Sequence, residues 1–188
     1  MRGWIDRGGI GRGGLVLAGL ALLAMVQIGA IVARASRATQ VPPARPPDLV
    51  IGDAVPAIRG LDARAGSTSV ALQREDARWT VLLAFSPTCA WCDSVAPRWK
   101  SWTAAIDRRV AVVGISSGEP SAALRYAHAH GWKLGALIVV DSAVTGVLGR
   151  QLTRKTPWLF LFDSRGVLRY SGHGNEVETV DSLAGISK

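Results

Sequence analysis

The sequence predicts an α/β layer fold that follows one N-terminal membrane helix, and three observations support this prediction. From Leu49 onward, strand and helix signals alternate along the chain. A pair of cysteines with two residues between them stands where an apolar strand gives way to a helix. Upstream, an apolar run of 20 residues without a formal charge extends from Gly14 to Ala33.

Composition already excludes several classes of protein. Of the 188 residues, 48% are hydrophobic and 19% are charged, which excludes disorder throughout the chain. The chain has only two cysteines, Cys89 and Cys92, so it is not a miniprotein cross-linked by several disulfides. The same count excludes a zinc site with four thiolate ligands.

The apolar run over residues 14–33 is long enough to cross a bilayer. At about 1.5 Å per residue, a helix of this length spans roughly 30 Å. Cleavable signal peptides have apolar regions of about 7–15 residues, so we expect an uncleaved anchor behind a basic head, residues 1–13. The alternative is cleavage near Ala33-Arg34-Ala35, although the arginine makes this a poor site. The short basic head favours a cytoplasmic N-terminus, whereas the arginine counts on the two sides nearly balance.

Residues 34–48 form a proline-rich linker before the domain expected over residues 49–188. Its prolines Pro42, Pro43, Pro46 and Pro47 favour an extended spacer, and a disordered stretch is the alternative. The chain after residue 33 has a net charge of +6, but its basic residues are scattered. Nucleic-acid binding needs a clustered basic stripe, so we expect none.

The first elements of the domain are strands. A short strand over Ser69–Leu72 follows the turn-prone residues Ala65-Gly66-Ser67. The run WTVLLAFS over Trp79–Ser86 is continuously apolar, which is typical of a central strand covered on both faces. Pro87 ends this strand.

A helix is expected next, over Cys89–Ile106. Apolar side chains fall at helical spacing on one face of it: Val95, Trp99, Trp102 and Ile106. Pro97 lies inside this helix and predicts a kink.

The remaining elements alternate and then end in a hairpin. Strands are expected at Val110–Ser116, Ala136–Asp141, Trp158–Asp163 and Val167–Ser171, and helices at Ser121–His130, Ala143–Arg150 and Val177–Ile186. Gly131 caps one helix, and Ser164-Arg165-Gly166 forms the turn between the last two strands.

The two cysteines carry the chemistry that we expect. In the first turn of a helix, Cys89 lies near unpaired backbone N–H groups and the positive end of the helix dipole. Both effects favour the thiolate and lower its pKa. Cys92 follows one turn later, where it can resolve a mixed disulfide.

Several motifs together resemble a thioredoxin-fold protein. They are the strand–SPTCAWC–helix unit, Pro97 five residues after Cys92, and Thr156-Pro157 ahead of WLFLFDSRGVL. The Val55-Pro56 opening and the expected anchor resemble the TlpA/ResA group of membrane-anchored thiol–disulfide oxidoreductases, and SPTC is similar to the MauD family. The resemblance covers about residues 50–185.

The resemblance implies a role for each site residue. Cys89 is the attacking thiolate and Cys92 the resolving thiol. Pro157 matches the family's cis-proline, and Thr156 matches the position whose backbone contacts substrate. Trp91, between the cysteines, is expected to be exposed and to contact a partner, while for Trp158 both a groove and a core position stay open.

The sequence thus predicts a thioredoxin-like fold, with a central mixed sheet flanked by helices, in a single-pass protein of the inner membrane. Its catalytic domain is expected outside the cytoplasm, where it exchanges disulfides with protein thiols such as apocytochrome c or a maturing dehydrogenase. No metal or organic cofactor is required. Reductase action is expected, while the partner, the reduction potential, the direction in vivo, anchor cleavage and the oligomeric state stay open.

A metallochaperone or assembly scaffold that binds copper is the alternative, with Cys89, Cys92 and His173 as ligands. Zinc would need further ligands, and His128 and His130 point away from each other on a helix. All three histidines are expected at the surface.

The sequence departs from thioredoxin at two positions. Ala90-Trp91 replaces the Gly-Pro pair, and Leu83 occupies the strand position of a buried acid. The proton acceptor for Cys92 therefore stays unassigned, with Asp93, Glu75 and Asp76 as nearby carboxylates in the sequence.

Overall fold

The computed structural model describes residues 22–30, 48–77 and 79–186. The chain divides into two units, Met1–Pro46 and Pro47–Lys188. In the first unit, residues 22–30 are helical and exposed. No helix in the described part of the chain is both long and apolar enough to cross a membrane. The head over residues 1–13, most of the run over residues 14–33 and almost all of the linker over residues 34–48 lie outside the described residues, so those expectations remain predictions.

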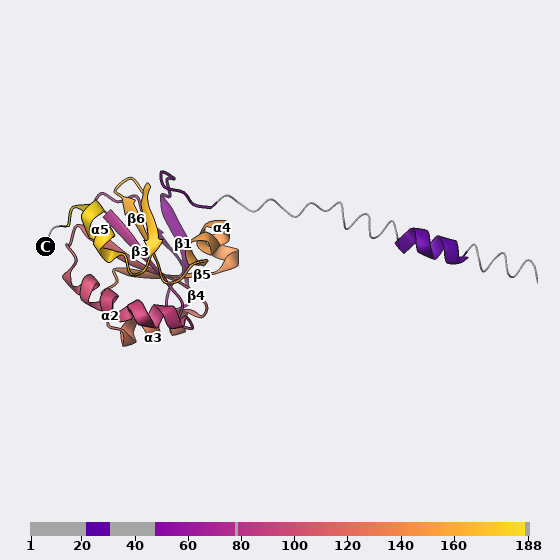
Figure 1. The fold of residues 1–188 in the computed structure, drawn as a ribbon, viewed down its shortest axis with the longest axis horizontal. Helices are drawn as coiled ribbons and strands as arrows, with labels where there is room; N and C mark the ends of the chain where they lie inside the picture. Colours follow the sequence, from indigo (N-terminus) through magenta and orange to yellow (C-terminus); the bar gives the residue numbers. More distant parts are fainter. Residues whose placement is uncertain (1–21, 31–47, 78, 187–188) are drawn as a thin grey trace, which may run out of the picture. The chain divides into compact units, whose positions relative to one another are not determined.

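A seven-stranded mixed sheet forms the centre of the second unit, in the order β2-β1-β5-β4-β3-β6-β7 (Figure 1). The strands are β1 (Ala57–Leu61), β2 (Ser67–Ala71), β3 (Trp79–Phe85), β4 (Val110–Ser117), β5 (Ala136–Val140), β6 (Trp158–Asp163) and β7 (Leu168–His173). β3, β4 and β5 run parallel, and the other pairs are antiparallel. This arrangement confirms the expected α/β fold and its late hairpin.

Helices cover both faces of the sheet. They are α2 (Ala90–Ala105), α3 (Pro120–Ala129), α4 (Ser142–Thr153) and α5 (Val177–Ala184). Residues of α2, α3 and α5 join one apolar cluster, whereas Leu152 of α4 joins the cluster on the other side. Figure 1 shows α2 and α3 running along the same side of the sheet.

Strand β3 links the two clusters, as its continuous apolar run predicts. Leu83 and Phe85 face the cluster that contains α2, and Leu82 and Ala84 face the one that contains α4. All four side chains are fully buried. Because β3 lies between β4 and β6, the loop that follows β3 leaves the sheet between inner strands, at the carboxyl end of β3.

Two features differ from the elements expected from sequence. Strand β1 was not predicted, because its AIRGL sequence contains Gly60 and lacks an apolar run. A Cβ at Gly60 would lie 2.3 Å from Ile138 and 2.6 Å from the Val139 carbonyl, so β1 packs close to β5 at this point. Helix α4 extends to Thr153 and is broken at Gly146, whose φ is 62°.

Most expected core positions of α2 are confirmed. Val95, Trp99 and Trp102 are buried, while Ile106 follows the helix and is half-buried. Pro97 lies inside α2, and the helix continues past it to Ala105.

Candidate active site

The candidate site forms where β3 passes into α2. Cys89 is the N-cap of α2, and its own N–H donates to the Ser86 carbonyl over 3.1 Å. No side chain caps the first turn at this residue. Since the first N–H groups of a helix lack partners within the helix, they are available to a negative charge on Cys89.

The Cys89 thiol contacts the loop that contains Thr156 and Pro157. Its Sγ donates to the Thr156 carbonyl oxygen over 3.5 Å, although the two residues are 67 positions apart in sequence. The Thr156-Pro157 peptide bond is cis, and Pro157 is buried. The structure thus brings together Cys89, Thr156 and Pro157, whose proximity we inferred from a family resemblance.

Hydrogen bonds favour the thiolate of Cys89. Burial alone raises the pKa of this half-buried thiol, but a side-chain hydrogen bond from Thr156 opposes that effect. The Cys92 thiol and the backbone N–H groups of Trp91 and Cys92 act in the same direction as Thr156. The net result is a pKa below the ordinary value, which increases the reactive fraction near neutral pH.

Cys92 differs from Cys89 in both its burial and the direction of its pKa shift. Its side chain is fully buried in the cluster that contains α2, and burial is the main cause that raises its pKa to about 12. The hydrogen bond and the charge of Cys89 raise it further, whereas the Ser86 backbone and the Thr156 side chain lower it. Both cysteines are present as free thiols. One sulfur is therefore suited to attack, and the other stays protonated until the first has reacted.

Two tryptophans near the site differ in environment. Trp91 is 73% exposed, as expected from its place between the cysteines. Trp158 is half-buried, packs against the core cluster behind α4 and donates from Nε1 to the Ser171 hydroxyl over 2.9 Å. Trp91 is thus available to contact a partner protein, while part of the Trp158 ring packs against the core.

A polar cluster beside the cysteines was missed in the sequence. The Tyr126 hydroxyl of α3 donates to Asp93 Oδ1 over 2.6 Å, and His130 Nε2 lies 3.6 Å from the same oxygen. Burial, Asp93 and the nearby cysteine charges raise the pKa of Tyr126, so its hydroxyl stays protonated. No motif marks Tyr126, because its place depends on how α3 packs against α2.

The carboxylates considered as proton acceptors lie in different regions. Asp93 is close to the cysteines, whereas Glu75 and Asp76 precede β3 and so stand at the opposite end of this strand from Cys89. Asp76 pairs there with Arg74. Leu83, at the position of thioredoxin's acid, is fully buried among apolar residues.

The histidines are partly enclosed. His128 is exposed as expected, while His130 and His173 are half-buried and so reach the surface with only part of their side chains. His130 packs against Tyr126 at 4.4 Å between ring centroids, and His173 Nδ1 accepts from the Asn175 N–H. Within the described residues, no three His, Cys, Asp or Glu side chains gather in a way that could hold a metal ion.

Comparison of the sequence with known proteins shows which proteins this chain is similar to. The profile of the AhpC/TSA family matches residues 51–171. The chain is 33% identical over 162 residues to the methylamine utilization protein MauD of Methylorubrum extorquens, covering 84% of this chain and 73% of that protein. It is 31% identical over 159 residues to MauD of Paracoccus denitrificans, covering 85% and 76%.

Solved structures share the fold at lower identity. The thioredoxin domain of a thiol–disulfide oxidoreductase from Bacteroides vulgatus superposes with a TM-score of 0.56 at 19% identity, covering 72% of this chain and 99% of that one. A peroxiredoxin-like protein from Aquifex aeolicus gives a TM-score of 0.54 at 14% identity, covering 74% and 90%. These similarities identify the fold as thioredoxin-like.

Proposed function

The chain belongs to the AhpC/TSA family and to its thioredoxin-like thiol–disulfide oxidoreductases, and from this premise we propose that Cys89 and Cys92 exchange a disulfide with partner proteins outside the cytoplasm. The observation that carries the proposal is that the two thiols differ in burial and in the direction of their pKa shifts. Cys89 is half-buried with a lowered pKa, and Cys92 is fully buried with a raised one.

The first step is attack by the Cys89 thiolate on a sulfur of the partner's disulfide. The partner's S–S bond breaks, a mixed disulfide forms with Cys89, and the released partner sulfur leaves as a thiolate that takes up a proton. The N–H groups at the start of α2 and the Thr156 side chain stabilise the thiolate before it attacks.

In the second step, Cys92 attacks Cys89 Sγ and gives up its proton, which the leaving partner sulfur takes up. The mixed disulfide breaks, a Cys89–Cys92 disulfide forms, and the second partner sulfur leaves and is protonated, so the partner gains two electrons. Once Cys89 is in a mixed disulfide, it has no negative charge. One of the causes that raises the pKa of Cys92 is then gone, which makes the resolving step easier.

Trapping the mixed disulfide tests this mechanism. In the full-length chain carrying Cys92→Ser, a covalent adduct with the partner should accumulate and should disappear on reduction. The double variant Cys89→Ser/Cys92→Ser is the control, since it differs from the trapping variant only in lacking the attacking sulfur. Absence of any adduct from membranes that contain the partner contradicts the mechanism.

We propose that the direction is reductive. A strong oxidant requires its reduced form to be stabilised as the thiolate, and here only Cys89 has a lowered pKa, whereas burial raises the pKa of Cys92 to about 12. Equilibration of the full chain with thiol buffers should give a potential nearer that of thioredoxin (about −270 mV) than that of DsbA (about −120 mV). A value close to that of DsbA would reverse the assignment.

The proposed location is the inner membrane, with the domain on its outer side. Support comes from the apolar run over residues 14–33 and from exposed apolar side chains in its described part: Leu22, Leu23, Met25, Val26 and Ile28. Membranes washed with alkaline carbonate should retain the full chain and lose a variant without residues 1–47. Equal release of both forms argues against an anchor.

The partner that we propose is a maturing secreted protein with paired cysteines. The similarity to methylamine utilization proteins favours a dehydrogenase under assembly, and apocytochrome c is the other candidate. Mass spectrometry of the Cys92→Ser adduct distinguishes the two.

A further inference from the structure

Trp99 connects the interior of α2 to the loop that faces Cys89. Its side chain is fully buried, and its Nε1–H donates to the Gly174 carbonyl oxygen over 2.8 Å. Gly174 follows the last residue of β7 and lies 75 positions away in sequence. The bond therefore ties α2 to the segment between β7 and α5.

Gly174 in turn supports the loop before β6. Its N–H donates to the Pro157 carbonyl oxygen over 3.1 Å. A Cβ at this position would lie 2.8 Å from Pro157 Cβ and 2.9 Å from Trp99 Cζ2, distances that real Cβ atoms do not adopt. Gly174 is thus packed between Trp99 and Pro157 with no room for a side chain.

These contacts form a closed series around the site, which we call the circuit. Trp99 bonds to Gly174, Gly174 bonds to Pro157, and the adjacent Thr156 carbonyl accepts from Cys89 Sγ over 3.5 Å. Cys89 begins the helix on which Trp99 stands. The position of Thr156 relative to the sulfur therefore depends on a buried indole nearly three turns further along α2.

We propose that Trp99 is a positioning residue, which acts through Gly174 to hold the Thr156-Pro157 loop against Cys89. This inference rests on the proposed function, because it concerns the reactivity of the attacking sulfur. Trp99 touches no reacting atom in this scheme. In this scheme its indole N–H sets the place of Thr156, whose side chain lowers the pKa of Cys89.

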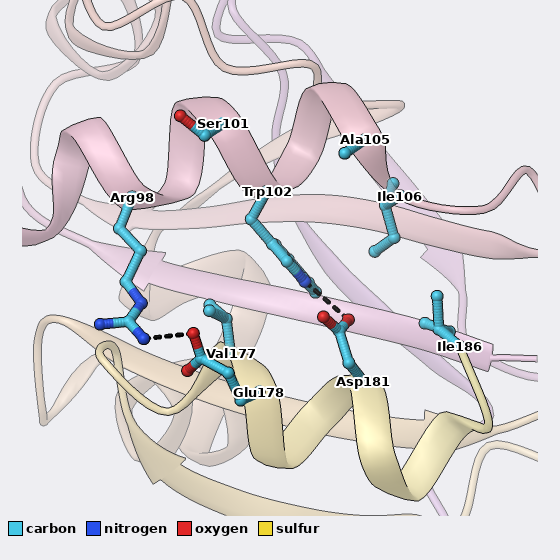
Figure 2. Close-up of a pocket in the computed structure, with 9 residues that line it drawn as sticks. All are labelled: Arg98, Ser101, Trp102, Ala105, Ile106, Val177, Glu178, Asp181 and Ile186. Atoms are coloured by element: carbon cyan, nitrogen blue, oxygen red, sulfur yellow. Dashed lines mark hydrogen bonds and ion pairs between the residues drawn. The ribbon is translucent and has the colours of Figure 1, made fainter. Parts of the chain in front are cut away.

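The same helix provides a matched control. Trp102 is almost fully buried, and its Nε1–H donates to Asp181 Oδ1 of α5 over 2.7 Å. Figure 2 shows this bond directed from α2 towards α5. Both residues line a cavity of about 510 Å³. Neither cysteine nor the Thr156-Pro157 loop lines this cavity. Trp99→Phe and Trp102→Phe each remove one indole hydrogen bond, and one of these bonds leads to the site.

The test is the pH dependence of alkylation at Cys89, measured by mass spectrometry with iodoacetamide on the reduced full-length chain. In Trp99→Phe the alkylation rate at pH 7 should fall about 3- to 10-fold and the profile should move to higher pH, because a small displacement of a supporting group has large effects on a reacting one. Trp102→Phe should stay within about 2-fold of the wild type. No change in Trp99→Phe, or equal changes in the two variants, overturns the proposal.

A second pair of variants tests the other side of the circuit. In Gly174→Ala the new Cβ displaces Pro157 or Trp99, and the Cys89 profile should shift in the same direction as in Trp99→Phe. Gly135→Ala is its control, since a Cβ there meets the Val112 carbonyl oxygen at an ordinary 3.4 Å. An unshifted Cys89 profile in folded Gly174→Ala protein contradicts the circuit.

Alkylation needs no partner, so the two proposals fail separately. A wild-type chain that reduces no protein disulfide refutes the proposed function, while its alkylation profiles still decide the role of Trp99. An active wild type with identical Trp99→Phe and Trp102→Phe profiles refutes the positioning role alone.

Discussion

Cys89 and Cys92 stand on the same turn of α2, yet the protein surrounds them in opposite ways. Cys89 is half-buried at the helix start, where a carbonyl oxygen and several hydrogen-bond donors approach its sulfur. Cys92 is fully buried in an apolar cluster. The difference shows that spacing alone makes the cysteines a pair, whereas the surrounding packing determines which one attacks.

The largest effect should come from removing the exposed member of the pair. Cys89→Ser should lower the reduction of a protein disulfide at least about 1000-fold, because removal of a nucleophile abolishes the steps that depend on it. Cys92→Ser should still complete one attack and release one equivalent of partner thiol. Turnover counted over the first minutes separates these outcomes, and equal first-turnover amplitudes in both variants would show that either sulfur can attack.

The alkylation of the two thiols should depend very differently on pH. Since the pKa of Cys92 is about 12 against an ordinary value of 9.0, its thiolate fraction at pH 7 is about 1000-fold below that of an ordinary thiol. Native reduced protein should therefore take up one iodoacetamide label, on Cys89, and unfolded protein should take up two. Peptide mapping checks this, and simultaneous labelling of both cysteines in native protein would contradict the assigned burial of Cys92.

A smaller effect should appear in alkaline stability. A thiol whose pKa is raised on folding stabilises the protein below its unfolded pKa, and this contribution is lost as pH rises from about 9 to 12. Tyr126 and Tyr170, whose pKa values are also raised, act in the same direction. The informative quantity is thus the difference between wild type and Cys92→Ala in urea unfolding. That difference should shrink above pH 9, and a constant difference would argue against a buried neutral thiol.

The smallest effect on the fold should come from Trp91→Ala. Because this indole is 73% exposed, its removal should change the free energy of unfolding by less than about 0.5 kcal/mol. It should instead raise KM for a protein disulfide and leave the rate with a small disulfide unchanged. Matching losses with both substrates would mean that Trp91 supports the cysteines and not the partner.

The parts of the fold that the sequence predicts well are those with strong local signals. The WTVLLAF run of β3 predicts a buried central strand, and the prolines and cysteines after it mark the start of α2. Strand β1 gives no such signal, since Gly60 suggests a turn unless its close approach to β5 is known. Local patterns report burial and chain direction, and they carry little information on contacts between distant segments.

The same distinction between local sequence signals and contacts of distant segments applies to the site residues. Cys89 and Cys92 are evident from their spacing, and Thr156 and Pro157 from a family resemblance. The bond from Trp99 to Gly174 joins residues 75 positions apart and has no motif. In sequence Trp99 is equivalent to Trp102, since both fall on the apolar face of α2, and three-dimensional packing alone distinguishes them.

The exposure of Trp91 has an optical consequence. The other described indoles are buried or half-buried, so among the described tryptophans dissolved iodide should quench mainly the emission of Trp91. Disulfides also quench a neighbouring indole, and Trp91 stands between the two sulfurs. The fluorescence of the unlabelled protein should therefore change as the dithiol closes, giving a continuous record of its oxidation state in a cuvette.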